Sequence, residues 1–147
     1  WRLTLQDRGS RSEVLDALVR SQAAFLRTGR SRVAEAAVAN VFVFRGGELC
    51  TPPGHDGALE GITQNSVATI AGDLGYEVVV DNIARSDLYI AEEAFVCGTA
   101  AEVSSISSVD DRSIPCPGPM TAAIAEVYHE AIRGKDPRYA HWCEHVA

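Results

Sequence analysis

The stretch Val96-Cys97-Gly98-Thr99-Ala100-Ala101-Glu102 is the most informative part of this sequence. The apolar residues 94–96 lead into it and a strand-like run over 103–109 follows it, so the pattern predicts two strands joined by a turn of small residues. Small side chains at a strand end let a ligand approach the backbone, and successive free N–H groups there bind anions. The turn at Thr99 is therefore a candidate anion site, with a tight turn that binds nothing as the alternative.

A second segment of the same kind is Gly61-Ile62-Thr63, which precedes a helical pattern over Gln64–Leu74. A threonine at a helix N-cap places a hydroxyl and unpaired amides at the positive end of the helix dipole, where a phosphate or carboxylate is stabilised. We therefore predict that Thr63 caps this helix and offers a second anion site, with ordinary capping as the alternative.

Turn and cap signals divide the rest of the chain into short elements. Gly46-Gly47 is typical of a two-residue hairpin turn, and Gly75 and Gly134 are typical of helix ends. Strands and helices alternate without the even spacing of a βαβ series, which favours the α+β class. The expected elements are helices over Ser12–Arg27, Gln64–Leu74, Ser86–Ile90 and Pro119–Arg133, a last short helix from Asp136, and strands over Val33–Glu35, Asn40–Phe44, Glu48–Thr51, Tyr76–Val80, Phe95–Cys97 and Val103–Val109.

Length and charge limit the classes of protein that fit. The 147 residues suffice for one domain with its own core, and the formal net charge of −7 argues against a nucleic-acid or anionic-membrane surface. No apolar run approaches the roughly 20 residues that a membrane span needs. Four scattered cysteines and the lack of a leader-like apolar segment lead us to expect reduced thiols and a cytoplasmic location. No metal site is expected, because His141, Cys143 and His145 have no second ligand cluster beside them.

Three motifs in order carry a family resemblance: Gly61-Ile62-Thr63, Gly98-Thr99-Ala100-Ala101-Glu102 and Gly118-Pro119-Met120-Thr121. They resemble the C-terminal large domain of branched-chain amino acid aminotransferases, which use pyridoxal phosphate and have the class IV (D-amino acid aminotransferase-like) fold. The resemblance implies an α+β domain with a barrel-like sheet flanked by helices. It covers about residues 32–147, and residues 1–31 are expected to be an N-terminal segment with one helix that differs from the family.

The resemblance also assigns expected roles to residues of this chain. It implies that Ile62 and Thr63 hold the cofactor phosphate, and that Thr99 adds a contact to it. The amides of Ala100 and Ala101 would bind the substrate carboxylate. Glu35 would bind the pyridine nitrogen and keep it protonated, which strengthens the electron sink. A homodimer or higher oligomer is implied as well.

The sequence departs from the family at two places. Residues 36–39 read Ala-Ala-Val-Ala where the family is rich in glycine, so side chains stand where the cofactor should lie close. The family's catalytic lysine lies some thirty residues before Glu35, but residues 1–12 contain neither lysine nor tyrosine. The only lysine is Lys135, in a turn that we predict to be exposed. No residue of this chain is therefore assigned as catalytic, and covalent attachment of the cofactor is not expected.

Three hypotheses remain open from the sequence. The chain resembles an enzyme that transfers amino groups between branched-chain amino acids and 2-oxoglutarate, of which it carries one part. Alternatively, it is a lysine-free descendant of the fold, independent of pyridoxal phosphate, that binds or acts on another small ligand. A third hypothesis is an interaction subunit that keeps only the fold and its dimer surface, because function resides in the site rather than in the fold.

Overall fold

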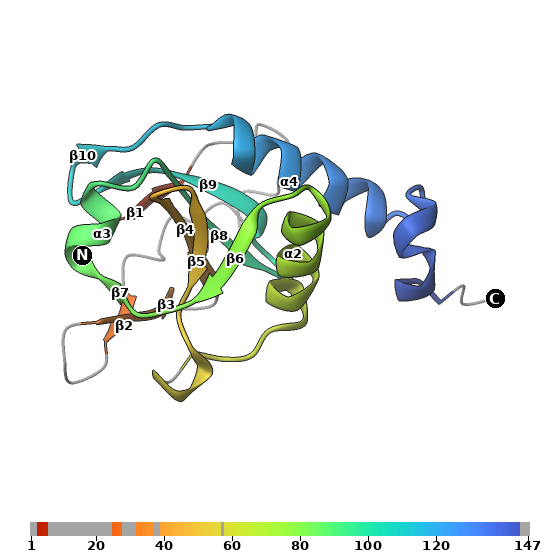
Figure 1. The fold of residues 1–147 in the computed structure, drawn as a ribbon, viewed down its shortest axis with the longest axis horizontal. Coiled ribbons are helices and arrows are strands. Elements are labelled where there is room, and N and C mark those ends of the chain that lie inside the picture. The colour runs from red at the N-terminus through yellow and green to blue at the C-terminus, as the bar shows by residue number, and fades with distance from the viewer. Residues whose placement is uncertain (1–2, 6–24, 28–31, 37–38, 57, 145–147) are drawn as a thin grey trace.

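The computed structural model describes residues 3–5, 25–27, 32–36, 39–56 and 58–144 (Figure 1). The strands are β1 (Leu3–Leu5), β2 (Phe25–Arg27), β3 (Arg32–Ala36), β4 (Asn40–Arg45), β5 (Glu48–Thr51), β6 (Glu77–Val80), β7 (Ile83–Ala84), β8 (Glu93–Gly98), β9 (Glu102–Val109) and β10 (Arg112–Ser113). The helices are η1 (Gly54–Asp56), α2 (Ile62–Asp73), α3 (Arg85–Tyr89), α4 (Pro119–Ala131) and η2 (Pro137–Trp142). None of the described helices has the length and apolar character needed to cross a membrane.

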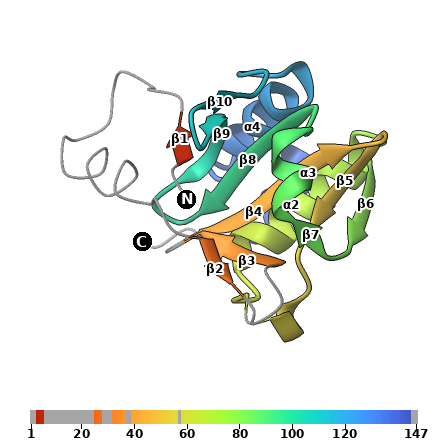
Figure 2. The same cartoon turned by 90° about the vertical axis from the view of Figure 1, so that its left-hand side faces the viewer.

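The strands form two sheets. Among the described residues, the main sheet has seven strands in the order β1-β9-β8-β4-β5-β6, with β10 also paired to β9, and β2, β3 and β7 form the second sheet. Neighbouring strands are antiparallel, except that β5 and β6 run parallel. Over the described residues the main sheet stays open, with β1 and β6 at its edges (Figure 2). The predicted α+β fold is confirmed, and its expected barrel-like sheet is an open sheet rather than a closed barrel.

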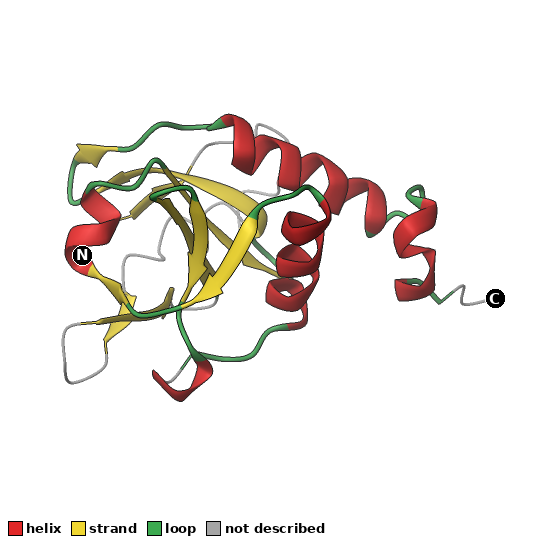
Figure 3. Ribbon diagram, viewed as in Figure 1, coloured by secondary structure: helices red, strands yellow, loops and turns green. Residues whose placement is uncertain are grey.

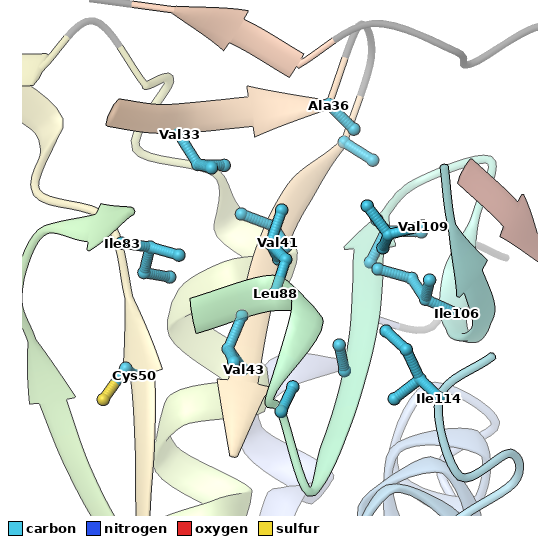
Figure 4. Close-up of a cluster of buried hydrophobic side chains, with 14 of the residues drawn as sticks. Val33, Ala36, Val41, Val43, Cys50, Ile83, Leu88, Ile106, Val109 and Ile114 are labelled. Carbon is cyan, nitrogen blue, oxygen red and sulfur yellow. The ribbon is translucent and has the colours of Figure 1, made fainter. Parts of the chain in front are cut away.

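The main sheet separates two apolar cores. Helices α2 and α4 cover one face, as Figure 3 shows, and there Phe42 and Phe44 of β4 pack with Ile70 and Ile124 of the helices. Helix α3 and the second sheet cover the other face, where Val41 and Val43 of the same strand are buried (Figure 4). Because β4 is buried on both faces, its sequence is apolar at every position from 41 to 44 instead of alternating.

The hairpin of β4 and β5 follows from its sequence. Gly46 and Gly47 have φ angles of +59° and +85°, which two successive glycines adopt at no steric cost. The β4 strand then pairs with β8, and the rings of Phe42 and Phe95 stack across this pair with their centroids 5.1 Å apart. The expected strands over 40–44, 48–51, 95–97 and 103–109 are thus confirmed.

Some expectations need correction. The helix predicted over Ser12–Arg27 is wrong at its end, because Phe25–Arg27 form strand β2 and pair with β3. A short apolar run is compatible with both a helix and a strand, and in the structure its pairing with β3 makes it a strand. Residues 12–24 lie outside the described residues. The last helix is present but is a 3₁₀ helix, η2, and begins after Asp136, whose side chain accepts a hydrogen bond from the Arg138 N–H.

Candidate functional site

A pocket of about 560 Å³ lies where the start of β4, the start of α2 and the end of β8 meet. Four of the six predicted site residues contribute to it: Glu35, Ile62, Thr63 and Thr99. Thr63 and Thr99 are 36 positions apart in the chain, so the fold brings the two predicted anion segments together. The other described residues that line it are Ala39, Asn40, Leu59, Glu60, Gly61, Cys97 and Gly98.

Helix α2 presents its positive end to this pocket. The helix begins at Ile62 with Gly61 as N-cap, so the prediction that Thr63 is the N-cap is wrong by two positions. Gly61 is extended and its cap has no side-chain hydrogen bond. Ile62 and Thr63 are the first two helical residues, and the amides of a first turn have no acceptor within the helix. Because the first turn also carries no acidic residue, its dipole is left to act on an anion.

The loop before α2 is fixed by two side chains from β3 and β4. A carboxylate oxygen of Glu35 accepts a hydrogen bond from the Leu59 N–H at 2.9 Å. The Asn40 side-chain amide donates to the Leu59 carbonyl at 2.7 Å, and Asn40 is 6% exposed. Both backbone polar groups of Leu59 are thus satisfied from the adjacent strands. A Cβ on Gly61 would overlap the Asn40 side-chain oxygen, so glycine at 61 lets the loop lie against Asn40.

The turn between β8 and β9 forms another wall. Gly98 pairs with Glu102, and Thr99, Ala100 and Ala101 make the loop between them. Thr99 is exposed and lines the pocket, whereas Ala101 is buried. Neither Ala100 nor Ala101 is among the residues that line the pocket, so the pocket brings together Ile62, Thr63 and Thr99 without these two alanines.

Two groups beside the pocket have raised pKa values. Burial raises the pKa of the Cys97 thiol from 9.0 to about 12, so Cys97 is a neutral apolar wall rather than a nucleophile. Burial also raises the pKa of Tyr128, an effect that its hydrogen bond with the Thr63 side chain partly opposes. Thr63 therefore lies between the pocket and the α4 residue Tyr128.

The Gly118-Pro119-Met120-Thr121 motif lies elsewhere and has a structural role. The carboxylate of Glu93, which is 3% exposed, accepts hydrogen bonds from the N–H groups of Met120 and Thr121 at 3.1 and 2.8 Å. It also accepts one from the Thr121 hydroxyl at 2.7 Å. Glu93 thereby caps α4 from the neighbouring strand β8, and no room remains for a Cβ on Gly118.

Sequence reasoning missed Asn40, Leu59 and Glu93 as parts of this arrangement. From the sequence, Asn40 could be identified only as the first residue of a strand, because its hydrogen-bond partner, Leu59, lies 19 positions away. The one available signal was a polar side chain at the head of an apolar run, which has to find a partner when buried.

The structure also shows where the two departures from the family pattern lie. Ala39 lines the pocket and Ala36 is fully buried beside it, so side chains do stand at this wall; residues 37 and 38 are outside the described residues. Lys135 follows α4, and its side chain is 62% exposed with Nζ 3.7 Å from a Glu130 carboxylate oxygen. Lys135 does not line the pocket. The described residues contain no cluster of three metal-ligating side chains.

Comparison with known proteins identifies the family of this chain. The family model described as amino-transferase class IV matches residues 14–109. A probable branched-chain-amino-acid aminotransferase of Aquifex aeolicus is 42% identical over 122 residues, which are 81% of this chain and 39% of the relative. The branched-chain aminotransferase of Thermoproteus uzoniensis, solved with norvaline, superimposes with a TM-score of 0.78 at 44% identity, covering 81% of this chain and 40% of that one.

The branched-chain amino acid aminotransferase of Thermobaculum terrenum, solved in its PLP-form, superimposes with a TM-score of 0.78 at 38% identity. That match covers 81% of this chain and 40% of the solved one. The chain thus spans about two fifths of the length of the curated relatives it matches. Since the family model covers well over half of its residues, this chain belongs to the class IV aminotransferases.

Proposed function

We propose that this chain forms the phosphate-binding and carboxylate-binding part of an aminotransferase that acts on branched-chain amino acids with pyridoxal phosphate and 2-oxoglutarate. The observation that carries the proposal is the pocket in which the first turn of α2, Glu35 and Thr99 meet. Its volume is in the range of small-molecule and cofactor sites. One relative of this chain was solved with pyridoxamine 5'-phosphate and, separately, with 4-methylvaleric acid, which are ligands of the two expected kinds.

The residues of the pocket fit pyridoxal phosphate in their chemistry. The amides of Ile62 and Thr63, with the hydroxyls of Thr63 and Thr99, are donors suited to a phosphate at a helix start. Glu35 uses one carboxylate oxygen for the Leu59 N–H and has a second one to accept from a pyridinium. When bound, the cofactor supplies the electron sink that the amino acid Cα–H needs in order to release its proton.

The chain's own residues would orient the two ligands. Asn40 and Glu35 hold the loop that ends at Gly61, and this sets the direction of the α2 amides toward the phosphate. The Thr99–Ala101 turn would direct backbone amides at the substrate carboxylate. The neutral Cys97 wall is apolar, which reduces the water around these charges and strengthens the interactions of the phosphate and carboxylate with their donors. In this proposal the catalytic amine belongs to polypeptide outside residues 1–147, because Lys135 is away from the pocket.

Binding of pyridoxal phosphate to the isolated chain tests the proposal. We expect Thr63→Val and Thr99→Val each to weaken binding by about tenfold or more, since each removes a hydrogen bond to a charged group. Thr69→Val is the matched control on the same helix, because the Thr69 hydroxyl donates to the Asn65 carbonyl and Thr69 lies outside the pocket. Phosphorus NMR of the bound cofactor measures the affinity of each variant.

Borohydride treatment adds a second measurement. We expect no site-specific covalent label on Lys135. A stable label there, with transamination of leucine or valine by this chain alone, would contradict the proposal that the catalytic amine lies outside residues 1–147. Binding of inorganic phosphate with no gain from the pyridine ring would instead support the alternative, a cofactor-independent descendant of the fold.

A further inference from the structure

The residue that closes the β8–β9 turn has an unusual backbone. Glu102 has a φ angle of +49°, in the left-handed backbone region that few residues other than glycine and asparagine adopt. A three-residue hairpin loop often ends with a residue in this conformation, and glycine is its usual occupant. Here a glutamate stands there, so contacts of its side chain have to offset the unfavourable backbone.

Helix α4 supplies such a contact. Nε2 of His129 lies 2.8 Å from a carboxylate oxygen of Glu102, and the two side chains are 25% and 33% exposed. The pair is half-buried, so solvent and salt screen it less than a fully exposed surface pair. His129 is itself held in place, because Glu93 fixes the start of α4 and the helix packs on β9 through Ile124 and Val103.

The other side of the turn is held from within β9. The Ser104 hydroxyl donates to the Ala101 carbonyl at 2.6 Å, and both residues are buried. The peptide between Ala101 and Glu102 is therefore fixed on one side by Ser104 and on the other by the Glu102 side chain. The directions of the Ala100 and Ala101 amides depend on this peptide, since the loop before it is short.

We propose that His129 is a positioning residue, which acts through Glu102 to hold the Thr99–Ala101 turn in the form that binds the substrate carboxylate. The inference rests on the proposed function for the role of the turn. It adds a residue of α4 that does not line the pocket. The expected ligand at this turn is a carboxylate, because successive backbone N–H groups favour an anion.

The test uses the 147-residue chain labelled with ¹⁵N and two probes, 4-methylvalerate for the turn and inorganic phosphate for α2. We expect 4-methylvalerate to shift the Ala100 and Ala101 amide signals in the wild type. His129→Ala is expected to weaken this binding by about tenfold, the effect of losing one hydrogen bond to a charged group. His129→Gln keeps a side-chain N–H donor and should stay within about threefold of the wild type. Phosphate binding should be equal in all of them.

Glu126→Ala is the matched control, because Glu126 is an exposed carboxylate on the same helix, three positions before His129. We expect it to bind both probes as the wild type does. Equal 4-methylvalerate affinity in His129→Ala and the wild type would overturn the inference. So would a parallel loss of phosphate and 4-methylvalerate binding, since that would indicate a general folding defect.

Hydrogen exchange separates this inference from the proposed function. If the wild type binds neither probe, the proposed function fails, and the amides of Ala100, Ala101 and Glu102 still report the position of the turn. We expect them to exchange faster in His129→Ala than in the wild type and in His129→Gln. Equal exchange rates in the three proteins would overturn the positioning role whatever the binding result.

Discussion

At the scale of single residues, Gly118 and Gly72 form a matched pair for testing the buried carboxylate of Glu93. The backbone of Gly118 is extended and acceptable to any residue, so only the lack of space forbids a side chain there. Gly118→Ala has to displace Glu93 and break its three hydrogen bonds to the start of α4, at an expected loss of about 3 kcal/mol or more. Gly72→Ala, at an open position inside α2, should gain about 0.5–1 kcal/mol.

Urea unfolding of both variants measures these changes in free energy. A Gly118→Ala protein within about 1 kcal/mol of the wild type would contradict the assigned role of Glu93, because simple removal of a cap typically costs that much. Gly72→Ala controls for the effect of adding a methyl group and removing backbone freedom.

Cys97 gives the molecule a specific pH dependence. Its thiol has a pKa of about 12 in the folded chain and 9.0 as its ordinary value. As the pH rises above 9, the unfolded chain loses this proton while the folded chain keeps it, so the free energy of unfolding falls until the folded pKa is reached. The slope from this one group is at most about 1.4 kcal/mol per pH unit. Cys97→Ala should therefore show a shallower loss of stability between pH 9 and about 12, measured by thermal unfolding, and equal slopes would contradict it.

At the scale of elements, the start of α2 depends on the fit between Gly61 and Asn40. Gly61→Ala should weaken pyridoxal phosphate binding and reduce stability, because the new methyl group overlaps the Asn40 side chain. Asn40→Ala should also do both, since it frees the Leu59 carbonyl. In the double variant the overlap is gone, so the two effects should be less than additive by about 0.5–3 kcal/mol. Strict additivity in a double-mutant cycle of unfolding free energies would contradict the contact.

The elements themselves were largely readable from local signals. Strands β4 and β5 and their turn follow from an apolar run and two glycines, and the end of α2 follows from Gly75, whose φ angle is +88°. The start of α2 was placed two residues late because Gly61 caps it without any side-chain bond, leaving Thr63 as the only visible cap candidate. Phe25–Arg27 was misread because its pairing with β3 is a tertiary contact.

In the candidate site, too, some residues have local sequence signals and others depend on contacts between distant parts of the chain. Thr63 and Thr99 could be found because helix starts and small-residue turns have local sequence signatures. The clamp of Glu35 and Asn40 on Leu59 could not, since its hydrogen bonds join residues 24 and 19 positions apart. Roles of Ile62, Thr63, Thr99, Glu35, Ala100 and Ala101 toward ligands stay predictions, as do the boundary at residues 31 and 32 and the cytoplasmic location.

At the scale of the whole molecule, exposed apolar side chains gather around the start of α2. Among the described residues, six large apolar side chains are exposed, and four of them, Leu59, Ile62, Ile132 and Trp142, line the pocket or the adjacent groove between α2 and α4. Such a patch marks an interaction surface. We expect the chain to sediment as a dimer or larger species at micromolar concentration. Ile62→Ser should weaken association and Ile90→Ser, next to α3, should not; a clean monomer would contradict this.

The order of strands in the main sheet also has a consequence for how the chain is made. Strand β4 can pair with β5 once Glu48–Thr51 has been synthesised, directly after the Gly46-Gly47 turn. Its other neighbour, β8, begins only at Glu93, and β1 can pair only after β9 has been synthesised. During translation, the early hairpin therefore emerges from the ribosome with both faces of β4 uncovered. Such nonlocal pairing slows folding and leaves apolar strands open to aggregation. Slow codons placed between β5 and β8 should lower the soluble yield, whereas the same codons after Gly134 should not.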